Sequence, residues 1–210
     1  GPIDHVTIFL GTASNDPVEL ADPTLNVAVA ETHYDSEFSA GGTTHDIGAV
    51  VAATELALAP VALHRDSLGD GDLGTSVHVV GYGESSGADL TSSGQRRSVD
   101  AKIFSVDDFH LGLDDVTCFG DSGGPTFLTK NGVVEIAGVH SFGPPDNCVG
   151  IGEDTRVDRY TSFVDSIVSS ADPGFPTGGG CSMSGARPDG ALAVALVALA
   201  RRRRTKKNGL

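Results

Sequence analysis

The sequence predicts an all-β protein. Its short apolar segments alternate with the two-residue period of strands, and turn-forming Gly, Pro, Asn and Asp residues separate them. Gly occurs 28 times and Pro 10 times, which is typical of a chain with many tight turns. At 210 residues, 39% of them hydrophobic, the chain is long enough for one domain and a tail but not for two ordinary domains.

Predicted strands occupy most of residues 1–170. In chain order they are His5–Leu10, Leu25–Val29, Ile47–Leu58, Val77–Tyr82, Val99–Val106 and Val133–His140. Turn signals bound them, such as Gly11 after the first strand and Asn131-Gly132 before the last. The polar segment Thr12–Thr24 is predicted to be a loop.

The end of this region carries one predicted helix, after which the composition changes. In Arg156–Ser170 apolar residues recur at helical spacing, namely Val157, Tyr160, Phe163, Val164, Ile167 and Val168. We therefore divide the chain into a domain over residues 1–170, a Pro- and Gly-rich linker over 171–180 and a tail over 181–210. The tail holds Cys181, an apolar run over Ala191–Ala200 and the basic block Arg201–Lys207.

The charge distribution argues against nucleic acid as a partner. The formal net charge is −14, and the basic block holds six of the 14 Lys and Arg residues. The rest of the chain has eight basic residues against 28 acidic ones, a net charge of −20, which repels phosphates. The acidic loop Asp66–Asp72 lacks the ligand spacing of an EF-hand, so we expect a solvated turn there. No metal and no cofactor are predicted.

The most specific motif is Gly120-Asp121-Ser122-Gly123-Gly124-Pro125. A serine hydroxyl is a weak nucleophile, so it needs a neighbouring base and backbone amides that bind the developing oxyanion. Glycine beside the serine lets the chain turn an amide inward with no side chain in the way. The motif resembles the nucleophile loop of trypsin- and chymotrypsin-like serine proteases.

This resemblance implies two six-stranded antiparallel barrels, the first of them incomplete in this chain, with one C-terminal helix and a tail. Ser122 would be the nucleophile, and the amides of Gly120 and Ser122 would form the oxyanion hole. Asp121 would pair with the N-terminal ammonium that zymogen cleavage creates. The matching segments run from about residue 5 to residue 170 and include Val77–Gly83, which resembles the strand that opens the second barrel.

A second motif, His45-Asp46-Ile47-Gly48-Ala49-Val50, resembles the family segment that carries the catalytic aspartate. Asp46 precedes Ser122 by 76 residues and would orient the catalytic imidazole. The family's histidine is expected about a dozen residues before Gly11, a position that falls just upstream of Gly1. Since none of the seven histidines in the chain carries the histidine motif, we expect the base upstream of residue 1 and no activity from these 210 residues alone.

A third segment, Ala137–Gly143, resembles the family strand whose backbone pairs with substrate. The resemblance further implies a Cys118–Cys148 disulfide and a substrate pocket that comprises Val116, Ser141, Gly143 and Gly152. An apolar floor at Val116 disfavours Arg and Lys substrates, because a buried cation would lack a partner. We therefore expect cleavage after apolar residues. A different alignment of this loop places Asp115 or Asp114 at the floor instead.

The tail resembles a bacterial sorting signal of the MYXO-CTERM type, through Gly180-Cys181-Ser182, the apolar run and Arg201–Arg204. In such signals the apolar stretch is helical and enters the bilayer while the cations hold its end on the cytoplasmic side. The resemblance implies sorting at Cys181 by a processing peptidase, transient membrane contact through residues 191–204, and secretion or anchoring at the outer envelope.

Two functions of different class follow from these patterns. The first is a secreted serine endopeptidase that forms an acyl-enzyme on Ser122 and acts on protein or peptide substrates. The alternative is a catalytically inactive, protease-like binding module that uses the same cleft for recognition. The residue at the upstream histidine position discriminates between them.

Overall fold

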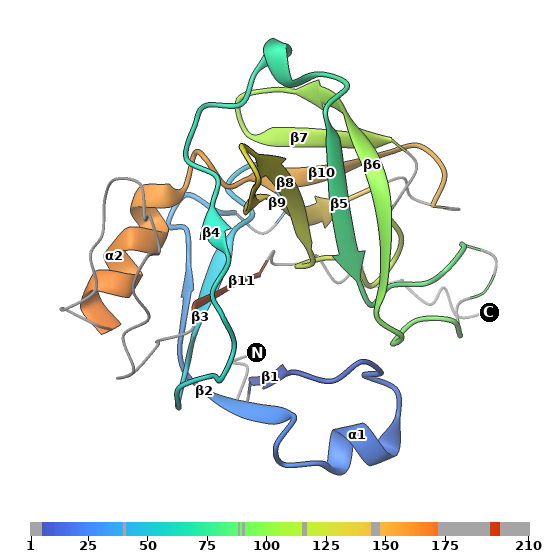
Figure 1. Cartoon of the computed structure of the whole chain (residues 1–210), viewed down its shortest axis with the longest axis vertical. Helices are drawn as coiled ribbons and strands as arrows, with labels where there is room; N and C mark the ends of the chain where they lie inside the picture. The colour runs from blue at the N-terminus through green and yellow to red at the C-terminus, as the bar shows by residue number, and fades with distance from the viewer. Residues whose placement is uncertain are drawn as a thin grey trace, which may run out of the picture.

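The computed structural model describes residues 6–39, 41–87, 89, 91–114, 117–143 and 148–171, together with the backbone of 194–197 (Figure 1). Two sheets and a C-terminal helix dominate this part of the chain. The elements in chain order are β1 (Thr7–Phe9), α1 (Pro17–Ala21), β2 (Asn26–Tyr34), β3 (Gly48–Ala52), β4 (Ala62–Leu63), the 3-10 turn η1 (Asp70–Asp72), β5 (Ser76–Gly81), β6 (Arg97–Val106), β7 (His110–Asp114), β8 (Pro125–Lys130), β9 (Val133–Phe142), β10 (Ile151–Arg156), α2 (Thr161–Ala171) and β11 (Val194–Val197).

Six strands close into an antiparallel barrel. The larger sheet has the order β10-β7-β6-β5-β8-β9-β4, and β10 also pairs with β9, which joins the two ends of the six-stranded part. Alternate side chains of each strand fill the interior, as in β5, where Val77 and Val79 are buried and His78 is exposed. The core of this barrel comprises Leu68, Val77, Val79, Ala101, Ile103, Leu111, Leu113, Leu128 and Ala137. This is the second barrel that the sequence predicts.

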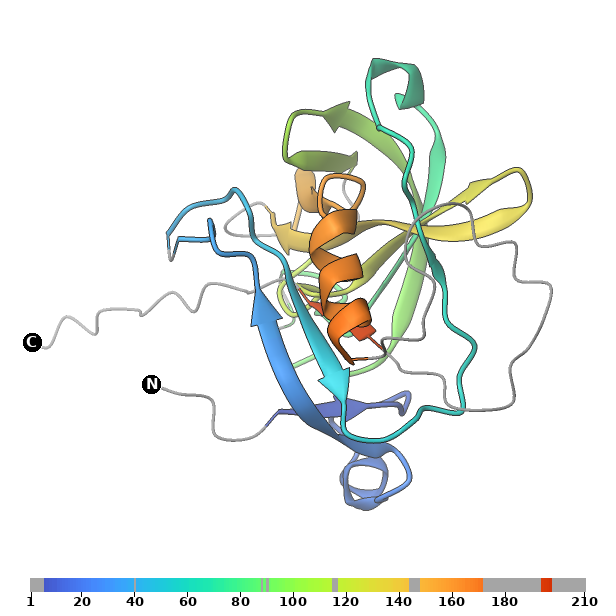
Figure 2. The ribbon, with the colours of Figure 1, turned by 90° about the vertical axis from the view of Figure 1, so that its left-hand side faces the viewer.

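The smaller sheet has the order β1-β2-β3-β11 and stands beside the closed barrel as a second sheet. All five residues of β3 are buried, and α2 lies against one face of this strand (Figure 2). Ile167 of α2 packs with Ala49 and Val51 of β3. The helix starts at Thr161, five residues later than the apolar spacing predicts, since β10 continues through Arg156.

The loop predicted over Thr12–Thr24 contains a short helix, α1. Asp16 is its N-cap, with a side chain that accepts a hydrogen bond from the Val18 amide, and Pro17 occupies the first turn. An Asp-Pro pair is a start signal for a helix, which explains the turn of helix in an otherwise polar segment. The carboxylate of Glu19 accepts hydrogen bonds from the Thr12 and Ala13 amides and so holds α1 against the segment that follows β1.

The backbone of Val194–Val197 forms a strand, β11, where the sorting-signal resemblance implies a helical apolar run. It pairs antiparallel with β3 over Gly48–Val51 and so satisfies backbone groups at the edge of that strand. The rest of the predicted linker and tail, with Cys181 and the basic block, lies outside the described residues. Within the described residues, no helix is both long and apolar enough to cross a bilayer.

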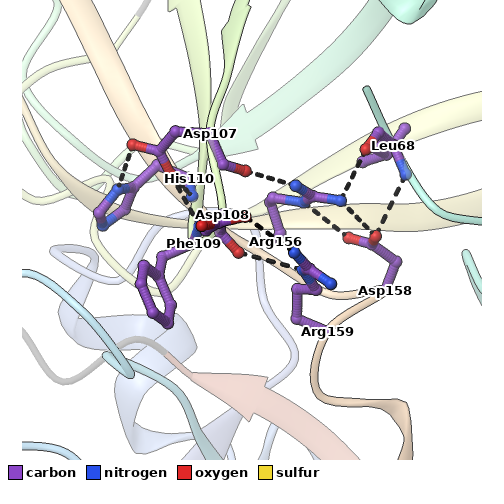
Figure 3. Close-up of polar contacts among 8 residues, drawn as sticks. All are labelled: Leu68, Asp107, Asp108, Phe109, His110, Arg156, Asp158 and Arg159. Atoms are coloured by element: carbon purple, nitrogen blue, oxygen red, sulfur yellow. Dashed lines mark hydrogen bonds and ion pairs between the residues drawn. The ribbon is translucent and has the colours of Figure 1, made fainter. Parts of the chain in front are cut away.

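A buried arginine joins the barrel to the segments around it (Figure 3). Arg156, at the end of β10, is 3% exposed and forms an ion pair with Asp158, whose side chain is 2% exposed, at 2.6 Å. Its guanidinium also donates to the carbonyls of Asp107 and Leu68, the latter at 2.8 Å. Asp158 in turn accepts the Leu68 amide. The turn before β7, the end of β10 and the segment between β4 and η1 are therefore held together by this ion pair.

Replacement of Arg156 by methionine is expected to destabilise the protein by about 3–5 kcal/mol, because it leaves the Asp158 carboxylate buried without its cation. Arg159→Met is the matched control, since Arg159 pairs with Asp108 at the surface, where both side chains are exposed. That change should cost ~1 kcal/mol or less. Denaturant unfolding of the two variants measures the difference, and equal losses would contradict the role assigned to Arg156.

Candidate active site

The nucleophile loop requires its glycines. Gly120 and Gly123 have φ of +96° and +88°, a region that other residues rarely adopt. A Cβ on Gly124 would lie 2.5 Å from the carbonyl oxygen of Val80, so no side chain fits between this loop and β5. The loop therefore packs directly on the barrel, and Ser122 lies partly exposed at its centre.

The amides of this loop fall into two groups. Those of Asp121, Gly123 and Gly124 donate to the carbonyls of Cys118, His140 and Asp121, at 3.1, 2.8 and 2.8 Å. Those of Gly120 and Ser122 donate to no acceptor in the part of the chain that the structure describes. These two amides, on either side of the bonded Asp121 amide, remain available as backbone donors of the kind that an oxyanion requires.

Asp121 holds the loop from the side opposite the serine. Its carboxylate oxygens accept hydrogen bonds from the amides of Gly83, at 2.7 Å, and Cys118, at 2.8 Å. Gly83 leaves space for this carboxylate, since a Cβ there would meet it at about 2.5 Å. Asp121 also lines a cavity of about 260 Å³, together with Glu84 and Arg97.

Ser141 connects the two residues that the sequence assigns to catalysis. Its hydroxyl donates to Oδ2 of Asp46 at 2.5 Å, and its carbonyl oxygen lies 3.4 Å from the hydroxyl of Ser122. Asp46 and Ser122 are 76 positions apart in sequence and thus share one residue of β9 as a neighbour. The sequence places Ser141 in the substrate pocket. In the structure its hydroxyl is engaged by Asp46.

The segment around Asp46 is fixed from several directions. Thr155 donates its hydroxyl to the Asp46 carbonyl at 2.8 Å, and the Asp46 side chain is buried. The ring of His45 packs on Phe109, with a centroid separation of 4.9 Å. Burial, with a smaller contribution from the Asp35 carboxylate, raises the pKa of Tyr160 to about 12, so its phenol stays protonated at neutral pH, and its oxygen lies 3.2 Å from Nδ1 of His45.

Each of the six described histidines pairs with a carboxylate other than Asp46. The pairs are His33–Glu31, His45–Asp35 and Glu37, His64–Glu135, His78–Asp100, His110–Asp107 and His140–Asp154. A catalytic base has to contact the nucleophile and be oriented by the triad carboxylate. Each of these rings is thus paired with a carboxylate other than Asp46, and the position of the base stays a prediction. His5 lies outside the described residues.

The predicted pocket walls lie together, and the predicted disulfide is formed. Cys118 and Cys148 are bonded, with a Cα–Cα distance of 4.8 Å. A Cβ on Gly143 would lie 3.9 Å from both the Cα of Gly152 and Oγ1 of Thr117, so these residues surround one space. Val116, the predicted floor, lies outside the described residues. Sequence reasoning missed Thr117, which no motif singles out.

Comparisons with known proteins agree with this geometry. The family described as Trypsin matches residues 4–164. The solved structure of neuropsin, a serine protease expressed in the limbic system of mouse brain, has a similar fold, with a TM-score of 0.58. The two chains are 20% identical, and the alignment covers 68% of this chain and 72% of the neuropsin chain. A search of curated proteins found no match. With its closed six-stranded barrel, its second sheet and its C-terminal helix, the chain belongs to the trypsin family of serine proteases.

Proposed function

We propose that the protein is a serine endopeptidase that hydrolyses protein or peptide substrates through an acyl-enzyme on Ser122. The observation that carries this proposal is the nucleophile loop, in which the amides of Gly120 and Ser122 are free while their neighbours are bonded. Ser122 would attack the scissile carbonyl, and the two amides would stabilise the oxyanion. Expulsion of the amine would leave the acyl-enzyme, which an activated water then hydrolyses.

The proposal assigns the triad carboxylate to Asp46. The Asp46 side chain is buried and accepts the Ser141 hydroxyl at 2.5 Å, and these contacts favour a carboxylate of fixed orientation, which is what positioning of an imidazole requires. Catalysis would also require a histidine base between the Asp46 and Ser122 side chains, and each of the six described histidines pairs with another carboxylate.

Asp121 has a proposed regulatory partner. In the zymogen scheme it pairs with a new N-terminal ammonium, and the cavity beside it, with the further carboxylate of Glu84, would accommodate a cation. The backbone bonds from Gly83 and Cys118 would then hold Asp121 in place before that ammonium arrives.

We also propose export of the protein. The Cys118–Cys148 disulfide favours an oxidising compartment. The composition of the tail supports processing at Cys181 by a sorting peptidase and transient membrane contact through residues 191–204, which would leave the protease secreted or at the cell surface.

A fluorophosphonate probe tests the proposed function. The protein with its upstream segment should react with the probe, and peptide mass spectrometry should locate the adduct on Ser122. Heat-denatured protein is the control, because an unfolded serine lacks both the base and the free amides. The alternative, an inactive binding module, predicts no adduct on the folded protein. It would also be supported by a residue other than histidine at the upstream position.

A further inference from the structure

The space between Gly143 and Gly152 is lined by polar side chains. A Cβ on Gly152 would collide with Oγ1 of Thr117 and would lie 3.3 Å from Cε1 of His140. At Gly152 the missing Cβ makes room for the Thr117 hydroxyl, whereas at Gly143 it leaves space that a side chain of another molecule can enter. The Thr117 hydroxyl borders the space at Gly143, and the edge of the His140 imidazole lies next to Gly152. An apolar substrate residue would cover both without bonding to either.

The hydroxyl of Thr117 lacks a hydrogen-bond partner. Thr117 is 4% exposed, and its Oγ1 is buried and unbonded in the part of the chain that the structure describes. A buried hydroxyl without a partner costs about 1–3 kcal/mol, so native proteins rarely retain one without a reason. Since Oγ1 faces the space beside Gly143 and Gly152, a ligand in that space is the partner that it can reach.

The imidazole of His140 is held with one nitrogen available. His140 and Asp154 face one another across β9 and β10, both buried, with Nδ1 and Oδ1 2.9 Å apart. A carboxylate in its ionised form only accepts hydrogen bonds, and Nδ1 is then the nitrogen that donates to it. Asp154 is the partner of this ring among the described residues, and Nε2 remains for a ligand. The edge that holds Cε1, between the two nitrogens, is the one that faces Gly152.

We propose that this pocket selects a substrate residue whose side chain ends in an accepting oxygen, the carboxamide of Gln or the carboxylate of Glu, and that Thr117 and His140 determine this specificity. The Thr117 hydroxyl donates to that oxygen. The neutral His140 ring accepts the N–H of a carboxamide at Nε2, and the protonated ring donates there to a carboxylate. This proposal rests on the proposed peptidase function and replaces the sequence-based expectation of an apolar residue, which depended on Val116.

Hydrolysis of a peptide series tests the proposal, with the histidine-bearing, full-length protein and substrates that differ only in the residue before the scissile bond. Gln or Glu should give a kcat/KM at least about tenfold above that of Leu, Phe or Arg. Comparison of the Gln substrate with the Glu substrate identifies whether a carboxamide or a carboxylate oxygen is bound. Preference for Leu, Phe or Arg would overturn the proposal. The fluorophosphonate probe has no such side chain, so labelled protein with a preference for Leu refutes the specificity alone, while unlabelled protein refutes the peptidase function.

Variants of Thr117 separate specificity from folding. Thr117→Val, which keeps the shape of the side chain, should lower kcat/KM for the preferred substrate by about 10-fold to 100-fold and should not lower it for Leu. Thr117→Ser should restore the preference, since it retains the hydroxyl. Thr129→Val, at an exposed position of β8, is the matched control and should leave the preference unchanged. An equal loss for every substrate in Thr117→Val would mean that the hydroxyl serves only the fold.

Discussion

Replacement of Ser122 by alanine is expected to lower kcat for peptide hydrolysis by about 10⁶-fold, since it removes the atom that forms the acyl-enzyme. The remaining site still offers the amides of Gly120 and Ser122 to an oxyanion, because these are backbone groups. Water can therefore attack a bound substrate directly, and a residual acceleration of about 10³–10⁴-fold over the uncatalysed reaction is expected.

Steady-state hydrolysis of a peptide substrate, with active sites counted by fluorophosphonate titration of the parent protein, measures this effect. Ser76→Ala is the matched control, because Ser76 is an exposed serine at the start of β5 and lies outside the nucleophile loop. Its kcat should equal that of the parent. If Ser122→Ala retained more than about a hundredth of the parent's kcat, the acyl-enzyme mechanism would be wrong, since loss of a covalent nucleophile cannot be so small.

The nucleophile loop could be predicted from sequence because each of its residues has a local reason. Gly120 and Gly123 are required by positive φ, and Gly124 by contact with β5. Strands such as β5 could also be predicted from the sequence. One face of β5 enters the barrel core and the other meets solvent, which produces an alternation of apolar and polar residues.

Two other strands, β7 and β2, show a weaker alternation of apolar and polar residues in the sequence. β7 was not predicted, since its first four residues, His110–Leu113, are all buried and therefore do not alternate. β2 was predicted to end at Val29 but extends to Tyr34, where most side chains are exposed polar groups that resemble a loop. Both outcomes reflect the same limit, because periodicity reports only strands with one buried and one exposed face.

The polar contacts of the site depend on the fold and have no motif. Ser141 is 95 positions from Asp46 but donates to it at 2.5 Å, because the fold brings β9 next to the segment before β3. Thr117 and His140 meet at Gly152 only once the barrel is closed by the β9–β10 pairing. Sequence motifs therefore singled out Ser122 and Asp46, whereas the contacts that Ser141, Thr117 and His140 make follow only from the folded structure.

Asp46→Asn is expected to lower kcat by about 10⁴-fold. The carboxylate of Asp46 can only accept hydrogen bonds, so an imidazole beside it is held with the proton on the nearer nitrogen and the lone pair toward Ser122. Asparagine can present its N–H₂ group instead, because its oxygen is already the better acceptor for the Ser141 hydroxyl, which lies 2.5 Å away. The imidazole then turns to the tautomer that cannot take the serine proton.

The pH profile of kcat/KM distinguishes this effect from a loss of structure. The Asp46→Asn protein should regain activity at high pH, where hydroxide can replace the misoriented base, while its unfolding midpoint stays close to that of the parent. Asp100→Asn is the matched control, since Asp100 pairs with His78 at the surface, at 2.7 Å, and its removal should change neither kcat nor the profile. An Asp46→Asn protein with parental kcat at neutral pH would remove Asp46 from the triad and leave Ser122 to be activated by a base with a different partner.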